Sequence, residues 1–92
     1  MKPKTIHRKN TPLSLRDMQG LVGGQIELAY DDGKTQIVCN DEGKMRGFPE
    51  NEEATDFWND EIEKNENYDD GYVNSDWLAG DVLILTDKAR MD

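Results

Sequence analysis

Histidine and cysteine, the side chains most often used in catalysis and metal binding, are almost missing from this chain. The 92 residues include one cysteine, Cys39, and one histidine, His7. A single cysteine excludes an internal disulfide and indicates a reducing compartment. No apolar run approaches the ~18–20 residues of a membrane span, and the N-terminus lacks the apolar segment of a signal peptide. These absences predict a cytoplasmic protein without a membrane segment.

The positions of these side chains also disfavour an active site or a metal site. His7 lies in an N-terminal segment without periodicity, and Cys39 alternates with Ile37, as a small core residue would. Neither has a plausible catalytic partner, so we expect no catalytic residue and no enzyme activity. Placing Gly71 at position 6 of an EF-hand loop puts Trp77 where the twelfth-position glutamate belongs. We therefore expect no cofactor and no metal, and favour a solvated acidic loop over a looser calcium site.

The net charge of −9 is unevenly distributed. Residues 50–76 hold eleven acids and one base, whereas residues 1–16 hold five bases and no acid. Repulsion from phosphates disfavours direct binding to nucleic acid. The distribution predicts a flexible basic arm over residues 1–11 and a single domain over residues 12–92, with an acidic helix and loop at residues 50–76.

Local signals predict a short helix that ends in a glycine corner. Ser14 is a suitable N-cap, and Asp17 completes a capping box three residues later. Apolar residues then recur at helical spacing: Leu15, Met18 and Val22. Gly23 suits the positive φ just past a helix end, and Gly24 allows the chain to reverse into a strand.

A β-hairpin is predicted next, because Asp32-Gly33 is a pair favoured in two-residue type I′ turns. With that turn, one face of the hairpin carries Ile26, Leu28, Tyr30, Thr35, Ile37 and Cys39. The other face carries Glu27, Ala29, Gln36 and Val38. Glu27, Gln36 and Val38 would then form an exposed surface and an alternative binding face.

The rest of the chain adds a turn, a helix and strands. Asn40–Gly43 has turn composition, Lys44–Phe48 is a candidate strand, and Asn51 is a candidate helix cap. The apolar stripe of that helix is Ala54, Phe57, Trp58 and Ile62. The run Val82–Leu85 predicts a central strand buried on both faces. Together these elements predict an α+β fold with two short helices and a mixed or antiparallel sheet of about three or four strands, built on the hairpin.

Four short motifs over residues 15–85 resemble the pattern of one family of small phage and mobile-element proteins. They are Met18–Glu27, Asn40–Lys44, Asn51 with Ala54-Thr55, and Ala79–Ile84. The family, domain of unknown function 3846, has the runs LQxLVGGxIE, NxEGK and VGDxLI in this order. Met18 stands where leucine is usual, and the loop Glu63–Asp76 is longer and more charged than the family pattern. The resemblance implies a phage protein that acts in the bacterial host cytoplasm. Structural roles are expected for Gly23, Gly24, Asp32, Gly33 and Gly80.

The acidic segment is the candidate binding surface. Its carboxylates are Glu52, Glu53, Asp56, Asp60, Glu61, Glu63, Glu66, Asp69 and Asp70, and its candidate aromatic anchors are Tyr68, Tyr72 and Trp77. We predict a non-enzymatic protein that engages a host protein, in host takeover or counter-defence, with charge steering the encounter. One alternative is a DNA mimic that inhibits a host DNA-binding or defence enzyme, because carboxylates along a helix approximate a phosphate track. Another is a sponge for a small anionic signalling nucleotide, held by Lys44, Arg46 and the basic arm.

Overall fold

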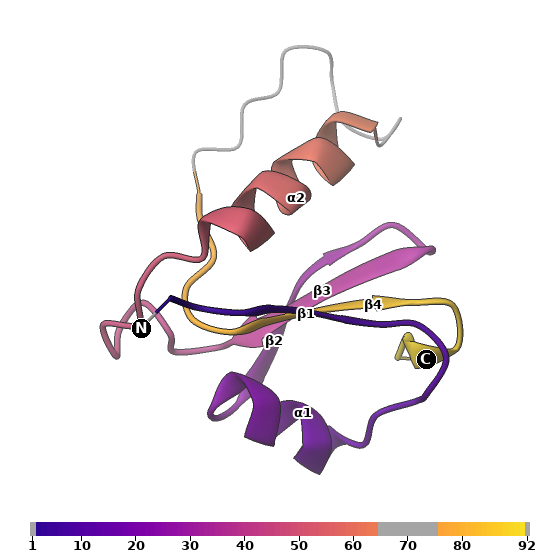
Figure 1. The fold of residues 1–92 in the computed structure, drawn as a ribbon, viewed down its shortest axis with the longest axis horizontal. Helices are drawn as coiled ribbons and strands as arrows, with labels where there is room; N and C mark the ends of the chain where they lie inside the picture. Colours follow the sequence, from indigo (N-terminus) through magenta and orange to yellow (C-terminus); the bar gives the residue numbers. More distant parts are fainter. Residues whose placement is uncertain (1, 65–75, 92) are drawn as a thin grey trace.

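The computed structural model describes residues 2–64 and 76–91, in which a four-stranded mixed sheet lies between two helices (Figure 1). The elements are β1 (Thr5–Arg8), α1 (Leu15–Val22), β2 (Ile26–Asp31), β3 (Thr35–Asn40), α2 (Glu52–Lys64), β4 (Val82–Thr86) and the 3₁₀ helix η1 (Asp87–Ala89). α1 covers one face of the sheet and α2 covers the other. This architecture confirms the predicted α+β fold.

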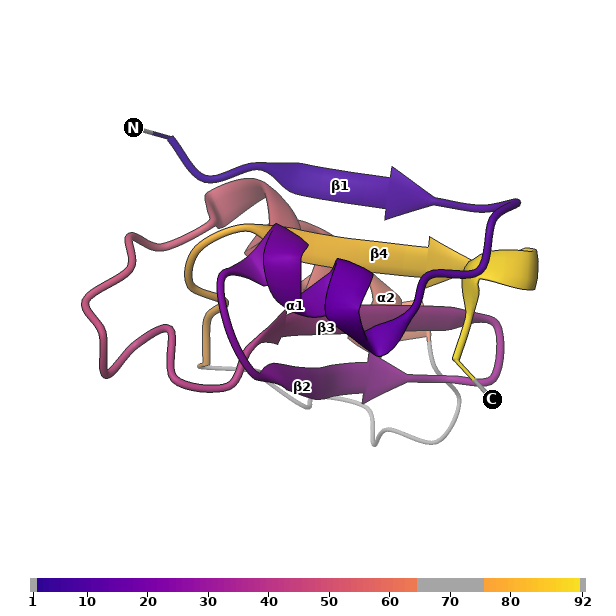
Figure 2. The ribbon, with the colours of Figure 1, turned by 90° about the horizontal axis from the view of Figure 1, so that it is seen from below.

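The strand order β1–β4–β3–β2 places β4 inside the sheet, as its apolar run predicts (Figure 2). β1 runs parallel to β4, whereas β3 is antiparallel to both β4 and β2. Side chains of β4 alternate between the two faces, with Val82 and Ile84 towards α2, and Leu83 and Leu85 towards α1. All four are at most 1% exposed, so the strand is buried on both faces.

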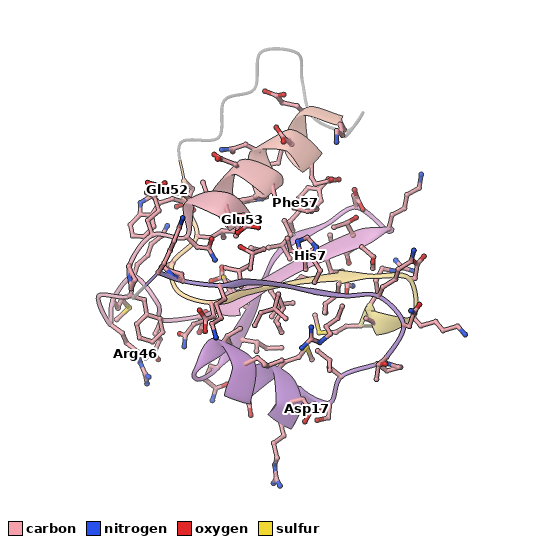
Figure 3. The ribbon with its side chains drawn as sticks, viewed as in Figure 1. His7, Asp17, Arg46, Glu52, Glu53 and Phe57 are labelled. Carbon is pink, nitrogen blue, oxygen red and sulfur yellow. The ribbon has the colours of Figure 1, made fainter. Side chains whose placement is uncertain are left out.

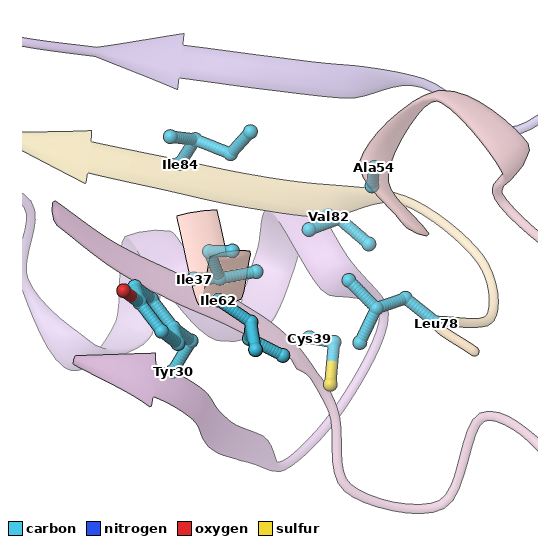
Figure 4. Close-up of a cluster of buried hydrophobic side chains, with 8 residues drawn as sticks. All are labelled: Tyr30, Ile37, Cys39, Ala54, Ile62, Leu78, Val82 and Ile84. Carbon is cyan, nitrogen blue, oxygen red and sulfur yellow. The ribbon is translucent and has the colours of Figure 1, made fainter. Parts of the chain in front are cut away.

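Each helix closes its own hydrophobic cluster. The cluster under α2 contains Tyr30, Ile37, Cys39, Ala54, Ile62, Leu78, Val82 and Ile84 (Figure 4). Phe57 and Trp58 pack against it, which confirms the predicted apolar stripe of this helix. The cluster under α1 contains Met18, Val22, Val38, Leu83, Leu85 and Ala89. Leu15 is 56% exposed, contrary to prediction, and Leu13 packs onto this cluster instead.

The predicted ends of α1 are confirmed. The Asp17 N–H donates to Ser14 Oγ at 3.0 Å, and the Ser14 N–H donates to Asp17 Oδ2 at 3.3 Å, which completes the capping box. Gly23 has φ +83°, and its N–H donates to the carbonyl of Gln19 at 2.9 Å. A residue with a Cβ is strained in this left-handed conformation, so the helix stops where glycine occurs.

The hairpin forms, but its predicted register is wrong. The observed pairs include Ile26 with Asn40, Leu28 with Val38, and Tyr30 with Ile37. An irregularity between Leu28 and Tyr30 shifts the pairing by one residue. Tyr30 therefore packs under α2 while Ile26 packs on the α1 side, although the two residues were predicted to share one face.

The turn of the hairpin lies one residue later than predicted. The Asp32 N–H donates to the Thr35 carbonyl at 3.3 Å, so Gly33 and Lys34 form the two-residue loop. Asp32 Oδ1 accepts the N–H groups of Lys34 and Thr35 at 2.9 and 2.7 Å. Burial alone would raise the pKa of Asp32, but these hydrogen bonds and one from Tyr30 lower it below its ordinary value.

The hairpin face that was predicted to be exposed is mostly buried. Gln36 and Val38 are 4% and 0% exposed. Val38 lies in the α1 cluster, and the Gln36 amide bonds the backbone of Met91. Of the alternative binding face, only Glu27 is exposed.

Two segments differ from prediction. Thr5–Arg8, expected in a flexible arm, forms β1 because its backbone completes a parallel ladder on β4. Lys44–Phe48, expected as a strand, forms none: residues 44–47 lie in consecutive turns, and Phe48 follows them. There the Arg46 N–H donates to Glu42, and the Phe48 N–H donates to Gly43, each at 2.9 Å.

Candidate functional site

α2 presents six carboxylates, named here the acidic face: Glu52, Glu53, Asp56, Asp60, Glu61 and Glu63. At ~3.6 residues per turn, all but Glu61 fall within an arc of about 100° that points away from the sheet. Those five residues are exposed, and Glu61 is half-buried on the flank of the helix. Glu52 and Glu53 begin this surface at the N-terminal turn (Figure 3).

The charge of the acidic face is not neutralised within the described residues. Their ion pairs are Lys9 with Asp87, Lys44 with Asp76, and Arg46 with Glu42, and none involves α2. Within the helix, Asp56 lies three or four residues from Glu52, Glu53 and Asp60. Such like-charged pairs destabilise a helix by roughly 0.2–0.5 kcal/mol each. The acidic face is therefore maintained at a cost in stability.

Replacing Asp56 by glutamine is expected to raise the free energy of unfolding by about 1 kcal/mol, because it removes three like-charge pairs. The measurement is urea denaturation at low ionic strength. Lys64→Gln removes the only base of α2, which lies four residues after Asp60. This variant is expected to lower the free energy of unfolding. If Asp56→Gln were no more stable than wild type, repulsion among these carboxylates would not destabilise the helix.

Five residues predicted for the binding surface lie outside the described residues: Glu66, Tyr68, Asp69, Asp70 and Tyr72. Trp77 is described, and a cation lies over its ring. Lys44 Nζ is 4.8 Å from the ring centroid and forms an ion pair with Asp76. The hydrogen bond from Lys44, and then that from the Trp77 N–H, hold the pKa of Asp76 below its usual range. An aromatic face beside a carboxylate is suited to binding organic cations.

These three side chains line a cavity of about 400 Å³, named here the Trp77 cleft. Its other walls include Glu27 from β2, Asp41 after β3, and Trp58 from α2. Sequence patterns do not bring these residues together, because they lie on elements far apart in the chain. Trp58 is predicted only as part of the apolar stripe of its helix, and Glu27 only as a residue of the hairpin surface.

Cys39 lies at the wall of the Trp77 cleft and is 6% exposed. Burial, and then the charge of Glu27, raise the pKa of its thiol to about 11. The thiolate is the reactive form of cysteine. The raised pKa thus leaves Cys39 unreactive at neutral pH. Its position in the cluster under α2 confirms the prediction that it is a core residue.

The folded protein is expected to react with a disulfide reagent at pH 8 about a hundredfold more slowly than the urea-unfolded chain, because the pKa lies near 11 rather than 9.0. A raised folded-state pKa also means that the thiol contributes stability below pH ~9, which is lost as the pH rises through ~11. Cys39→Ala is the control, and its loss of stability over that range should be smaller. Equal reaction rates of folded and unfolded chains would contradict the burial of the thiol.

His7 belongs to β1, and its ring meets Phe57 of α2 edge-on (Figure 3). The ring centroids are 5.7 Å apart at an interplanar angle of 80°. This contact gives the histidine a packing role between strand and helix. Within residues 2–64 and 76–91, no group of three or more His, Cys, Asp or Glu side chains is arranged to hold a metal ion.

The described structure is that of a small α+β domain with an acidic helix face and an aromatic-lined cleft. The family model described as Domain of unknown function (DUF3846) matches residues 1–91, so the chain belongs to this family. No curated protein and no solved structure is detectably similar to it. In the part of the chain that the structure describes, no helix is long and apolar enough to cross a bilayer.

The motifs that carry the family resemblance contact one another where β4 begins. Asn40 Nδ2 donates to the carbonyl of Val22 at 3.1 Å, which joins the second motif to the first. Asn51 Nδ2 donates to the carbonyl of Gly80 at 3.1 Å, which joins the third to the fourth. Both bonds hold backbone segments together, so they indicate that the motifs maintain the fold.

Proposed function

We propose that this protein is a non-enzymatic binding protein whose acidic face engages a basic surface of a protein partner. The observation that carries the proposal is the exposed stripe of α2 carboxylates, which has no cationic partner among the described residues. The phage setting implied by the family resemblance favours a host bacterial protein as the partner, met in the host cytoplasm during host takeover or counter-defence.

Physical chemistry supports a charge-steered encounter. Opposite surface charges raise association rates strongly at low salt, and salt screens them within about 8–10 Å. The repulsion within α2 lowers the stability of the free helix. A basic partner would relieve that repulsion on binding. The clustered carboxylates would therefore favour the bound state as well as speed the encounter.

The test begins with capture of a partner from bacterial lysate and then measures association rates at two salt concentrations. The variant Glu52→Gln/Asp56→Asn/Asp60→Asn is expected to associate at least about tenfold more slowly at low salt, with a weaker salt dependence. The matched control Glu42→Gln/Glu50→Gln/Asp87→Asn removes the same charge elsewhere and is expected to change the rate much less. Equal effects of the two variants would show that only net charge matters, which contradicts the proposal.

A DNA mimic is the second candidate, favoured by the spacing of the carboxylates. Glu52 to Glu63 spans about 16 Å at ~1.5 Å per residue. Six charges over this length give one per ~3 Å, close to the ~3.4 Å phosphate spacing of one DNA strand but half the density of a duplex. This candidate predicts that DNA displaces the protein from its partner. The nucleotide sponge has less support, because Asp76 and Glu42, the carboxylates beside Lys44 and Arg46, would repel an anionic ligand.

A further inference from the structure

We infer that the Trp77 cleft receives a lysine or arginine side chain of the partner, at the position that Lys44 occupies in the free protein. The inference deepens the proposed function and rests on it, because it takes the partner to be a basic protein. It adds a second binding element, separate from the acidic face, that recognises one side chain by its shape and charge.

The first observation is that the cleft already binds an ammonium group of its own chain. Lys44 Nζ lies 4.8 Å from the centre of the Trp77 ring and pairs with Asp76. The two paired side chains are 43% and 56% exposed. Exposed ion pairs contribute little to stability. A cation from outside can therefore replace Lys44 at small cost, and the displaced lysine returns to water.

The second observation is the surplus of negative charge around the cleft. Of the described residues, three carboxylates, Glu27, Asp41 and Asp76, line it together with one ammonium, that of Lys44. Within the described residues, neither Glu27 nor Asp41 is part of an ion pair. All three carboxylates act on the Cys39 thiol in the direction that disfavours its anion, which agrees with a negative field in the cleft.

The third observation is the size and lining of the cavity. A volume of about 400 Å³ lies within the ~300–1,000 Å³ typical of ligand pockets, and a side chain fits it readily. Trp58 adds a second aromatic wall to that of Trp77. An anion would be repelled by the carboxylates, and an apolar group would leave them desolvated and unpaired. A guanidinium or ammonium group on a flexible stem satisfies both the rings and the carboxylates.

The test uses a hexa-arginine peptide as the probe, with hexa-glutamate as the negative control. The chain has two tryptophans, and both line the cleft, so their fluorescence reports binding there directly. The variant Glu27→Gln/Asp41→Asn is expected to bind the peptide about tenfold more weakly than wild type. Asp60→Asn/Glu63→Gln removes the same charge from the acidic face, and we expect it to have a clearly smaller effect on this signal.

A second pair of variants tests the displacement of Lys44. Lys44→Gln removes the internal cation and is expected to tighten peptide binding about three- to tenfold. Lys64→Gln makes the same charge change at the end of α2, away from the cleft, and should tighten it much less. If the Glu27→Gln/Asp41→Asn variant does not fold in a melting control, the comparison of Lys44→Gln with Lys64→Gln still tests the inference.

The inference is overturned if both carboxylate variants weaken binding equally, or if Lys44→Gln tightens it no more than Lys64→Gln. Those results would leave the proposed function intact, because that proposal depends on association kinetics with the protein partner. Conversely, the proposed function would be refuted if neutralising the acidic face left the association rate with the partner unchanged, even if the peptide titration succeeds. The two failures are therefore distinguishable.

Discussion

Replacing Gly80 by alanine is expected to destabilise the protein by about 2–5 kcal/mol. Gly80 has φ +75°, and the left-handed conformation costs a residue with a Cβ roughly 1–2 kcal/mol. The added Cβ would also lie 2.7 Å from Cδ2 of Phe48 and 3.4 Å from its Cβ and Cγ. Overpacking of this kind costs a further ~1–3 kcal/mol. Urea denaturation measures the sum of the two effects.

Gly33→Ala separates the two contributions. Gly33 has a similar φ of +86°, but an added Cβ would meet no atom within 4 Å. Its substitution is therefore expected to cost only the backbone term of ~1–2 kcal/mol. Shortening Phe48 to leucine in the Gly80→Ala background should recover part of the difference in a double-mutant cycle. If the two alanine variants are equally stable, the Phe48 ring moves aside freely and the packing argument fails.

The parts of the fold that the sequence predicts correctly depend on local interactions. The capping box joins Ser14 to Asp17, and the left-handed Gly23 lies directly after its helix. The stripe on α2 follows from helical periodicity, and the burial of β4 follows from an uninterrupted apolar run. Each of these signals is complete within about ten residues, so no knowledge of the tertiary structure is required.

The parts that were predicted wrongly depend on partners distant in the sequence. β1 is a short strand of mixed polarity, and the contacts that stabilise it are distant in sequence: it pairs with β4, 77 residues later, and His7 packs on Phe57 of α2. The hairpin register differs from prediction because the turn lies one residue later and an irregularity follows between Leu28 and Tyr30. In this register the Tyr30 hydroxyl donates to the backbone carbonyl of Glu61 at 3.1 Å. Turn statistics favour Asp-Gly but do not include that tertiary contact.

The same distinction applies to the candidate site. The acidic face can be predicted because carboxylates and apolar residues alternate with the period of one helix. The Trp77 cleft cannot, because β2, β3, α2 and the segment before β4 each contribute to its lining. Lys44 in particular carries no local sign of its role, since its contact with Trp77 joins residues 33 positions apart.

Asn51 joins three of these distant segments, and every hydrogen-bonding position of its side chain is used. Nδ2 donates to the carbonyls of Lys4 and Gly80, both at 3.1 Å. Oδ1 accepts the N–H of Ala54 at 3.0 Å and the hydroxyl of Thr5 at 3.1 Å. The residue is 1% exposed, so water cannot replace these bonds. It thus caps α2 while fixing that helix, with its acidic face, to β1 and to the start of β4.

Replacing Asn51 by alanine is expected to cost about 3 kcal/mol or more. Loss of the cap contributes ~1 kcal/mol, and each buried partner left without a bond contributes ~1–3 kcal/mol. The Gly80 carbonyl and the Thr5 hydroxyl are the groups most affected, because the Lys4 carbonyl also accepts the N–H of Val82. Urea denaturation at neutral pH provides the measurement.

Asn51→Asp distinguishes the lost bonds from the lost volume, because aspartate has nearly the same shape and is an equally good cap. Its second oxygen would face the carbonyls of Lys4 and Gly80, which require donors. Burial and these carbonyls should raise the carboxyl pKa above its unfolded value of ~3.9. The variant is then most stable, relative to wild type, below pH ~4, and loses stability as the pH rises through the folded pKa.

Asn51→Ala should differ from wild type by the same amount at every pH. A pH-independent difference for Asn51→Asp would mean that the side chain does not donate to these carbonyls, and that α2 is fixed to the sheet by its apolar contacts alone.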